Sequence, residues 1–323
     1  MIEMSRQPSV RILPNIPPWL PGNADTLCAE LEERLSGIDV RPVTYLLASD
    51  CNWLNAEVLI TNRHVDRILR ESDDLEWIQV LTAGVDGYPL EELREQNVIL
   101  TSASGVHKEP VTEHVLGYIL LFDRRLLDAR AQQERKEWRR MSAREVHGNT
   151  LGVVGLGKIG QHIATVASAL GMNVIGSKRT PEEIEGVTDV YPADDLEPIL
   201  RQSDYLVLSC PLTDETRGLI TRDEYKAMKD DAILINVSRG AVTPEDALVE
   251  ALQHRRIRGA ALDVFETEPL PAQSPLWTTE NVVITPHNAG TTPQYLDRCA
   301  EIFAENYRCF AAGKLDEMRN RIL

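Results

Sequence analysis

The chain has 323 residues, and its 34 basic and 50 acidic side chains give a net charge of −16. A surface this acidic repels nucleic-acid backbones and anionic lipid headgroups, which excludes nucleic-acid binding and membrane-surface binding as functions. A hydrophobic content of 43% with 26% charged residues is ordinary for a globular protein and excludes global disorder. At roughly 150 residues per domain, the length predicts two domains.

Lysine is scarce among the basic residues. The sequence contains seven lysines, and all its other basic residues are arginines. Excess carboxylate with few long aliphatic lysine stems suits a protein adapted to high salt, because the carboxylates keep the surface hydrated. We therefore expect salt adaptation, and an ordinary acidic enzyme is the alternative interpretation.

The five cysteines are scattered, and none has the spacing of a zinc site or of a disulfide framework, so no metal is expected. The first ten residues lack the basic and apolar regions of a signal peptide. The longest apolar run, residues 116–122, is too short to cross a bilayer. These features predict a cytoplasmic protein.

Short apolar runs alternate with amphipathic segments over the first hundred residues. Helices are predicted at residues 25–35 and 89–96, and strands at 10–16, 42–48, 57–62, 77–84 and 97–103. This alternation is typical of an open parallel sheet. A charged stretch with helical spacing follows at residues 110–140 and predicts one or two extended helices.

A second α/β series begins at residue 150. A helix is predicted at 159–170, and strands at 150–155, 172–177, 205–209, 232–237, 260–265 and 282–286. No strand follows the last predicted helix, at 293–311, so that helix must pack on an element already formed, and the N-terminal sheet is its natural partner. We predict an α/β protein with two doubly wound parallel-sheet domains. A Rossmann dinucleotide-binding domain at 104–289 is inserted in a flavodoxin-like substrate domain at 1–103 plus 290–323.

A glycine-rich turn follows the strand predicted at 150–155. Gly155, Gly157 and Gly160 form the pattern GxGxxG, with Lys158 and Ile159 between the last two glycines. The bare pattern is weak evidence, but here a strand precedes it, a helix opens inside it and a second strand follows. The first glycine permits a tight turn, the second lets the backbone approach a pyrophosphate, and the third allows close helix packing. We expect a bound dinucleotide; a purely structural turn is the alternative.

The end of the next strand discriminates between nicotinamide cofactors. NAD enzymes usually carry an acidic residue there for the ribose hydroxyls. This chain has two hydroxyls and two cations instead, in the order Ser177, Lys178, Arg179 and Thr180. These groups suit a 2′-phosphate, so we expect NADPH to be preferred, with NADH as a possible second cofactor. A solvated basic turn that binds NAD without the acid is the alternative.

Three further motifs follow predicted strands in the C-terminal half. NVSRGA supplies Arg239, DVFETEP supplies Glu268, and TPHNAG supplies His287. Reduction of a 2-oxo acid needs a cation that orients the carboxylate and an acid that protonates the developing alkoxide. Arg239 suits the first task and His287 the second, with Glu268 favouring the imidazolium. Each residue alone has a structural explanation, but the three together favour catalysis.

The order of GLGKIG, CPLTDET, NVSRGAV, LDVFETEPLP and TPHNAG resembles the D-2-hydroxyacid dehydrogenase family over most of residues 80–290. The resemblance implies that Arg239, Glu268 and His287 are the catalytic triad. It also implies that Asp263 helps to hold the nicotinamide carboxamide and that the amides of Gly84 and Val85 meet the substrate, together with Arg239 and His287. The remaining cofactor contacts that it implies are Cys210, Pro211, Thr216, Val237, Ser238 and Gly290, besides Arg239 and His287.

The expected function is the NADPH-dependent, reversible reduction of 2-oxo acids to D-2-hydroxy acids. A glyoxylate/hydroxypyruvate reductase is the narrower alternative, and a dinucleotide-sensing regulatory protein is the alternative from another class. The sequence before residue 75 matches the family only loosely, so the resemblance does not identify the substrate. The resemblance also implies a homodimer that uses residues 110–140, for which an exposed domain-spanning helix is the alternative.

Overall fold

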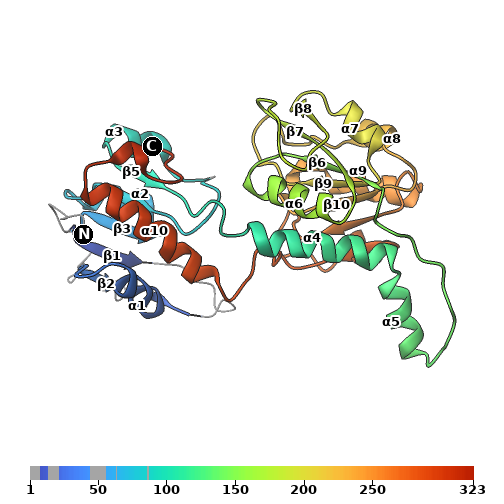
Figure 1. Cartoon of the computed structure of the whole chain (residues 1–323), viewed down its shortest axis with the longest axis horizontal. Helices are drawn as coiled ribbons and strands as arrows, with labels where there is room; N and C mark the ends of the chain where they lie inside the picture. Colours follow the sequence, from blue (N-terminus) through green and yellow to red (C-terminus); the bar gives the residue numbers. More distant parts are fainter. Residues whose placement is uncertain (1–7, 14–21, 44–55, 63, 86) are drawn as a thin grey trace. The chain divides into compact units, whose positions relative to one another are not determined.

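A computed structural model describes residues 8–13, 22–43, 56–62, 64–85 and 87–323. The chain divides into two compact units: unit 1 contains residues 1–107 and 291–323, and unit 2 contains residues 108–290. The chain therefore leaves unit 1, forms the whole of unit 2, and returns to complete unit 1 (Figure 1). The predicted strands at 10–16 and 42–48 run on into residues 14–21 and 44–55, which lie outside the described part of the chain.

Unit 1 is built on a five-stranded sheet in which every pair is parallel, in the order β2-β1-β3-β4-β5. This is the flavodoxin-like order. The strands are β1 (Val10–Leu13), β2 (Val40–Pro42), β3 (Val58–Thr61), β4 (Trp77–Gln79) and β5 (Ile99–Thr101). The helices are α1 (Ala24–Arg34), α2 (Val65–Glu71), α3 (Leu90–Glu95) and α10 (Tyr295–Ala311).

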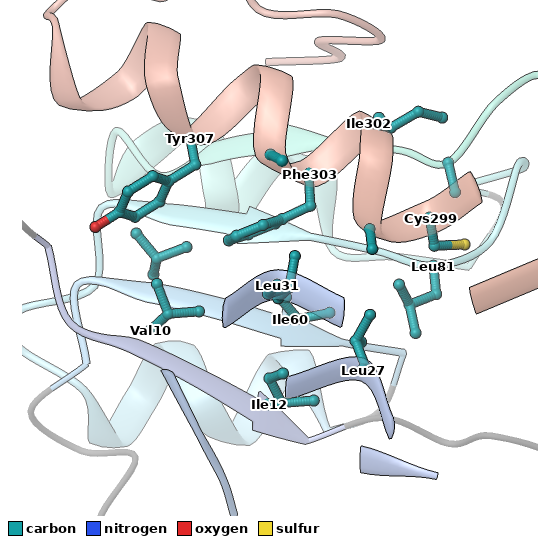
Figure 2. Close-up of a cluster of buried hydrophobic side chains, with 14 of the residues drawn as sticks. Val10, Ile12, Leu27, Leu31, Ile60, Leu81, Cys299, Ile302, Phe303 and Tyr307 are labelled. Atoms are coloured by element: carbon teal, nitrogen blue, oxygen red, sulfur yellow. The ribbon is translucent and has the colours of Figure 1, made fainter. Parts of the chain in front are cut away.

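Helix α10 completes the core of unit 1. Its apolar residues recur every three or four positions, which places Cys299, Phe303 and Tyr307 on one buried face. Figure 2 shows this face against Ile60 and the other apolar side chains of β1, β3 and α1. The Phe303 ring stacks on the fully buried Trp77 ring of β4, with 4.9 Å between ring centroids. The prediction that the last helix packs on the N-terminal sheet is confirmed.

Unit 2 is built on a seven-stranded parallel sheet in the order β12-β11-β10-β9-β6-β7-β8. Strand order reverses between β6 and β9, as in a doubly wound Rossmann sheet. The strands are β6 (Thr150–Val154), β7 (Asn173–Lys178), β8 (Asp189–Pro192), β9 (Tyr205–Leu208), β10 (Ile233–Asn236), β11 (Gly259–Leu262) and β12 (Val282–Ile284). The sequence did not predict β8, because this edge strand has no apolar run: its two ends are exposed and its middle is half-buried.

The helices of unit 2 are α4 (Lys108–Asp123), α5 (Leu126–Glu134), α6 (Lys158–Ala169), α7 (Glu197–Gln202), α8 (Arg222–Ala227) and α9 (Glu245–Gln253). The stretch predicted at 110–140 forms the two helices α4 and α5. They separate at Arg125, whose φ of 54° lies in the left-handed region and interrupts the helical backbone. Figure 1 shows α5 and the segment after it projecting from the rest of unit 2.

The described residues include neither a membrane-spanning helix nor a cluster of metal-binding side chains. No helix among them is long and apolar enough to cross a bilayer. The same residues contain no group of three or more His, Cys, Asp or Glu side chains arranged to hold a metal ion. Cys28, Cys210, Cys299 and Cys309 are free thiols, and Cys51 lies outside the described residues.

Candidate functional site

The three glycines after β6 have three different surroundings. Gly155 has a φ of +97°, and a Cβ there would lie 2.7 Å from the backbone of Cys210. A Cβ on Gly160 would lie 2.2 Å from the carbonyl oxygen of Gly155. A Cβ on Gly157, in contrast, would meet no atom within 4 Å. The first and third positions therefore require glycine for close packing, and the middle one borders open space, where a ligand can approach the backbone.

Helix α6 begins beside that open space. Gly157 is its N-cap and has no side chain with which to accept hydrogen bonds from the first-turn amides. The N-terminus of a helix attracts anions through these amides and through the helix dipole. The turn and α6 thus fit the pyrophosphate of a dinucleotide, with the exposed Lys158 at the first helical position.

The end of β7 lies next to this turn. Ser177 is buried, and its carbonyl oxygen accepts hydrogen bonds from the amides of Gly155 and Leu156 at 3.2 and 2.8 Å. Lys178, the last residue of β7, forms an ion pair with Glu182. The predicted phosphate-binding lysine therefore has a carboxylate partner in this structure.

Arg179 also faces a carboxylate, on the loop after β9. A hydrogen bond from Thr213 and, more weakly, the charge of Arg179 hold the pKa of Glu215 below its ordinary value. Thr180 follows Arg179 at the surface. A 2′-phosphate at this end of β7 would meet two cations that each have an acidic neighbour, so it must compete with those neighbours.

The loop after β9 carries three of the predicted cofactor residues. Cys210 is buried, and burial raises the pKa of its thiol to about 11. Thr216 closes the loop, because its hydroxyl donates to the carbonyl oxygen of Pro211 at 2.6 Å and accepts from the amide of Thr213 at 2.7 Å. These contacts give the loop its shape, and the predicted contact with a cofactor stays a prediction.

His287 and Glu268 meet across two loops. The Nδ1 atom of His287 lies 2.6 Å from Oε2 of Glu268, and Oε1 of Glu268 accepts a hydrogen bond from the Phe265 amide at 3.0 Å. The His287 side chain is 51% exposed and the Glu268 side chain 35%. With Nδ1 directed at the carboxylate, Nε2 is the ring nitrogen that can exchange a proton with a ligand.

Gly240 brings the arginine loop against the glutamate loop. A Cβ on Gly240 would lie 1.9 Å from the carbonyl carbon of Phe265, so the backbones after β10 and β11 are in direct contact. Arg239, directly before Gly240, is exposed, and its Nη1 donates to the carbonyl oxygen of Ser238 at 2.7 Å. Asn236 shapes this loop: its side chain accepts from the amide of Ser238 at 3.0 Å. Val237, between them, is half-buried.

The carboxylate of Asp263 is surrounded by donors from the histidine loop. It accepts hydrogen bonds from the Thr285 hydroxyl at 2.5 Å and from the amides of Asn288 and Ala289, both at 2.9 Å. The residue is 2% exposed. Its predicted contact with the nicotinamide carboxamide stays a prediction, and its observed contacts tie down the loop that carries His287.

Sequence reasoning missed Thr285 and two residues of α4, His114 and Tyr118. The Nε2 atom of His114 lies 3.2 Å from the Thr285 hydroxyl oxygen, and the Tyr118 hydroxyl also contacts that oxygen. The only signal for this pair was the spacing of four residues, which puts both side chains on one face of a helix.

The predicted substrate residues Gly84 and Val85 belong to unit 1. Their strand was predicted at 77–84, but β4 ends at Gln79, and irregular backbone follows. The carbonyl oxygen of Gly84 accepts from the Thr82 hydroxyl at 2.9 Å, and that of Val85 accepts from the Tyr88 amide at 3.2 Å. Gly290 is the last residue of unit 2. The roles of these residues stay predictions.

A separate cavity of about 680 Å³ lies in unit 2. Its lining includes Asp230, Asp231, Arg258, Glu280 and Asn281, which come directly before β10, β11 and β12. It therefore lies at the amino ends of the strands. Arg239, Glu268 and His287 follow the carboxyl ends of the same strands, where ligands of such sheets bind.

Comparisons with known proteins place the chain among its relatives. The family model described as "D-isomer specific 2-hydroxyacid dehydrogenase, NAD binding domain" matches residues 116–289. A glyoxylate reductase from Aeropyrum pernix is 38% identical, over 80% of this chain and 79% of its own length. A D-3-phosphoglycerate dehydrogenase from Methanocaldococcus jannaschii is 37% identical over 77% of this chain, and the chain spans about half of that protein, 48%.

Solved structures show the same fold over nearly the whole chain. A D-isomer specific 2-hydroxyacid dehydrogenase from Xanthobacter autotrophicus Py2, in complex with NADPH and MES, is 28% identical, with a TM-score of 0.84 over 98% of each chain. The chain belongs to the D-isomer specific 2-hydroxyacid dehydrogenase family. Members of this family are NAD(P)-dependent oxidoreductases.

Proposed function

We propose that this protein catalyses the NADPH-dependent, reversible reduction of 2-oxo acids to D-2-hydroxy acids. The observation that carries the proposal is the 2.6 Å pair of His287 and Glu268. This pair lies at the carboxyl edge of a sheet whose first turn fits a dinucleotide pyrophosphate. An acid–base pair at the same sheet edge as a cofactor turn can supply the proton that carbonyl reduction requires.

The reaction needs one hydride and one proton. When bound, the reduced nicotinamide supplies the hydride to the carbonyl carbon. His287 donates a proton from Nε2 to the carbonyl oxygen, and Glu268 orients the ring and stabilises its protonated form. In the reverse direction His287 accepts the hydroxyl proton. Arg239 binds the substrate carboxylate through its guanidinium.

The proposed cofactor residues are those of the turn after β6 and the end of β7. Gly155, Gly157 and Gly160 let the backbone approach the pyrophosphate. Lys178 and Arg179 provide positive charge for a 2′-phosphate, where an NAD enzyme usually carries an acid. The relative solved with NADPH supports the use of this cofactor.

A glyoxylate/hydroxypyruvate reductase is the second candidate, and it is a narrower form of the same activity. The name of the Aeropyrum pernix relative favours it. A dinucleotide-sensing regulator is a different class, and it has no use for a coupled His287–Glu268 pair beside Arg239.

The test is a kinetic panel with the purified protein. Oxidation of NADPH is followed after addition of pyruvate, 2-oxobutyrate, a branched 2-oxo acid, glyoxylate or hydroxypyruvate. We expect turnover with at least one of them and the D enantiomer as product. Retained NADPH binding without turnover on any of them favours the regulator. Turnover confined to glyoxylate and hydroxypyruvate favours the narrower reductase.

We also propose that the protein is a homodimer. Large apolar side chains are exposed on α4, on α5 and just after α5: Leu120 at 38%, Leu126 at 51%, Leu127 at 49% and Trp138 at 96%. Such a concentration of exposed apolar side chains marks an interaction surface. Light scattering should give twice the 36.2 kDa of the chain, and replacement of Leu126 and Leu127 by Asp should give a monomer. A wild-type monomer contradicts the proposal.

A further inference from the structure

The loop that carries His287 has a backbone conformation that is unfavourable for a residue other than glycine. His287 itself has a φ of 52°, in the left-handed region that costs a non-glycine residue free energy. Three hydrogen bonds to Asp263 surround this residue: its own amide donates to the Asp263 carbonyl at 2.8 Å, and the next two amides donate to the Asp263 carboxylate. The position of the catalytic imidazole therefore depends on how firmly Asp263 is held.

Thr285 also donates a hydrogen bond to Asp263. Its hydroxyl donates to the carboxylate oxygen Oδ1 at 2.5 Å. A hydroxyl has one proton, and a carboxylate can only accept, so this proton is committed to Asp263. The two other groups at the same hydroxyl oxygen, the phenol of Tyr118 and Nε2 of His114, must then act as donors.

We propose that His114 and Tyr118 of α4 are positioning residues that act through Thr285 and Asp263 to fix the loop of His287. The proposal rests on the proposed function and adds three residues to it. Thr285 accepts two hydrogen bonds from α4 and donates one to Asp263. The Asp263 carboxylate in turn accepts hydrogen bonds from two backbone amides of the loop. A chain of directed hydrogen bonds thus runs from the helix to both residues after His287.

The surroundings of the α4 pair support this arrangement. The His114 and Tyr118 rings pack edge to face, with 4.6 Å between centroids, which fixes both rings. Tyr118 is 4% exposed and the His114 side chain 24%. Burial lowers the pKa of His114, and the charge of Asp263 opposes this shift. The neutral ring with its proton on Nε2 is the form that can donate to Thr285.

The first test compares Thr285→Val with Thr285→Ser. Valine has nearly the shape of threonine but removes the hydroxyl, whereas serine keeps it. Because a hydrogen bond to a charged group is lost, we expect Thr285→Val to lower kcat about ten- to a hundredfold. Thr285→Ser should recover most of this loss. The Kd for NADPH should change less than kcat, because the glycine turn after β6 and the end of β7 are not disturbed.

Tyr118→Phe and His114→Gln extend the test to α4. Phenylalanine removes one donor without changing the ring, so kcat should fall less than in Thr285→Val. Glutamine keeps a donor near the place of Nε2, so it should lower kcat less than His114→Leu does. Thr278→Val is the matched control, since its exposed hydroxyl donates to the Pro275 carbonyl, and it should behave as wild type.

Amide hydrogen exchange of a peptide covering residues 285–290 measures how firmly the loop of His287 is held, without any need for turnover. Exchange should be faster in Thr285→Val than in wild type and slow again in Thr285→Ser. Wild-type kcat and wild-type exchange in folded Thr285→Val overturn the proposal; if that variant does not fold, the same result in Tyr118→Phe overturns it. A wild-type protein that reduces no 2-oxo acid overturns the proposed function instead, and the exchange data still test the anchoring.

Discussion

His287 and Glu268 lie 19 positions apart in the chain, yet their Nδ1 and Oε2 atoms are 2.6 Å apart. They meet because neighbouring parallel strands, β11 and β12, end at the same edge of the sheet. The carboxylate is held independently by the Phe265 amide, so it can orient the imidazole and does not simply follow it. The His287 ring has one nitrogen, Nδ1, on the carboxylate and the other, Nε2, available for proton transfer, as a general acid–base pair requires.

Replacement of His287 by Ala should lower kcat about a hundred- to ten-thousandfold, because proton transfer to the carbonyl oxygen is lost. NADPH binding should be unchanged, since the glycine turn and the end of β7 remain. The measurement is steady-state kinetics together with a fluorescence titration of NADPH. Glu268→Gln is the companion variant, because it keeps the shape of the side chain and removes its charge. A near-wild-type kcat in His287→Ala contradicts the assignment.

Removal of the Lys178 charge should change cofactor choice. In Lys178→Gln we expect kcat/KM for NADPH to fall about tenfold, the worth of one charge-assisted contact, with little change for NADH. Glu182→Gln should act in the opposite direction, because it removes the carboxylate that competes with a phosphate for Lys178. Both variants and the wild type are compared with both cofactors. A higher kcat/KM for NADH than for NADPH in the wild type contradicts the proposed preference for NADPH.

Acid should destabilise the protein partly through His114. Burial lowers the pKa of this side chain below its ordinary 6.5, against the opposing charge of Asp263. As the pH falls below 6.5, the unfolded chain takes up the proton first, so it binds more protons than the folded chain and the free energy of unfolding decreases. His114→Gln should therefore lose less stability than wild type between about pH 7 and pH 5. Urea denaturation at both pH values gives the comparison, and equal losses contradict it.

Activity should persist in concentrated salt. The body of the protein, at −16, repels both an anionic cofactor and an anionic substrate. Screening shortens the reach of these charges from about 8–10 Å at ordinary ionic strength to about 3 Å at 1 M. Long-range repulsion is thereby removed while close pairs remain, so kcat/KM should be kept or increased. A steep loss of activity with a folded protein favours an ordinary acidic enzyme.

The sequence predicted the fold well because continuous apolar runs mark strands that are buried on both faces. Most strands with an apolar run were found, but β4 proved shorter than its run, and β2 shares only Pro42 with the strand predicted at 42–48. Edge strand β8 was missed because only Val190 and Tyr191 are even half-buried there. The return of α10 to the first sheet was predictable, since an amphipathic helix with no following strand needs an existing surface.

Only those residues of the candidate site that lie in a recognisable motif could be proposed from the sequence. Arg239, Glu268 and His287 stand out because they follow strands in short, distinctive motifs. The ion pair between Lys178 and Glu182 was not predicted, because sequence spacing does not show whether a lysine at the end of a strand pairs with a nearby carboxylate. The roles of Thr285 and His114 depend on a contact between residues 171 positions apart, which no single-sequence pattern reports.

The return of α10 to unit 1 also orders events during protein synthesis. Every residue of unit 2 is made before residue 295 leaves the ribosome, so unit 2 can fold while the first sheet still lacks its covering helix. Until then the side chains that meet Phe303 and Tyr307, Trp77 among them, have no partner from α10. Nascent chains that stop before α10 should therefore expose an apolar sheet face, which is the kind of surface that chaperones bind.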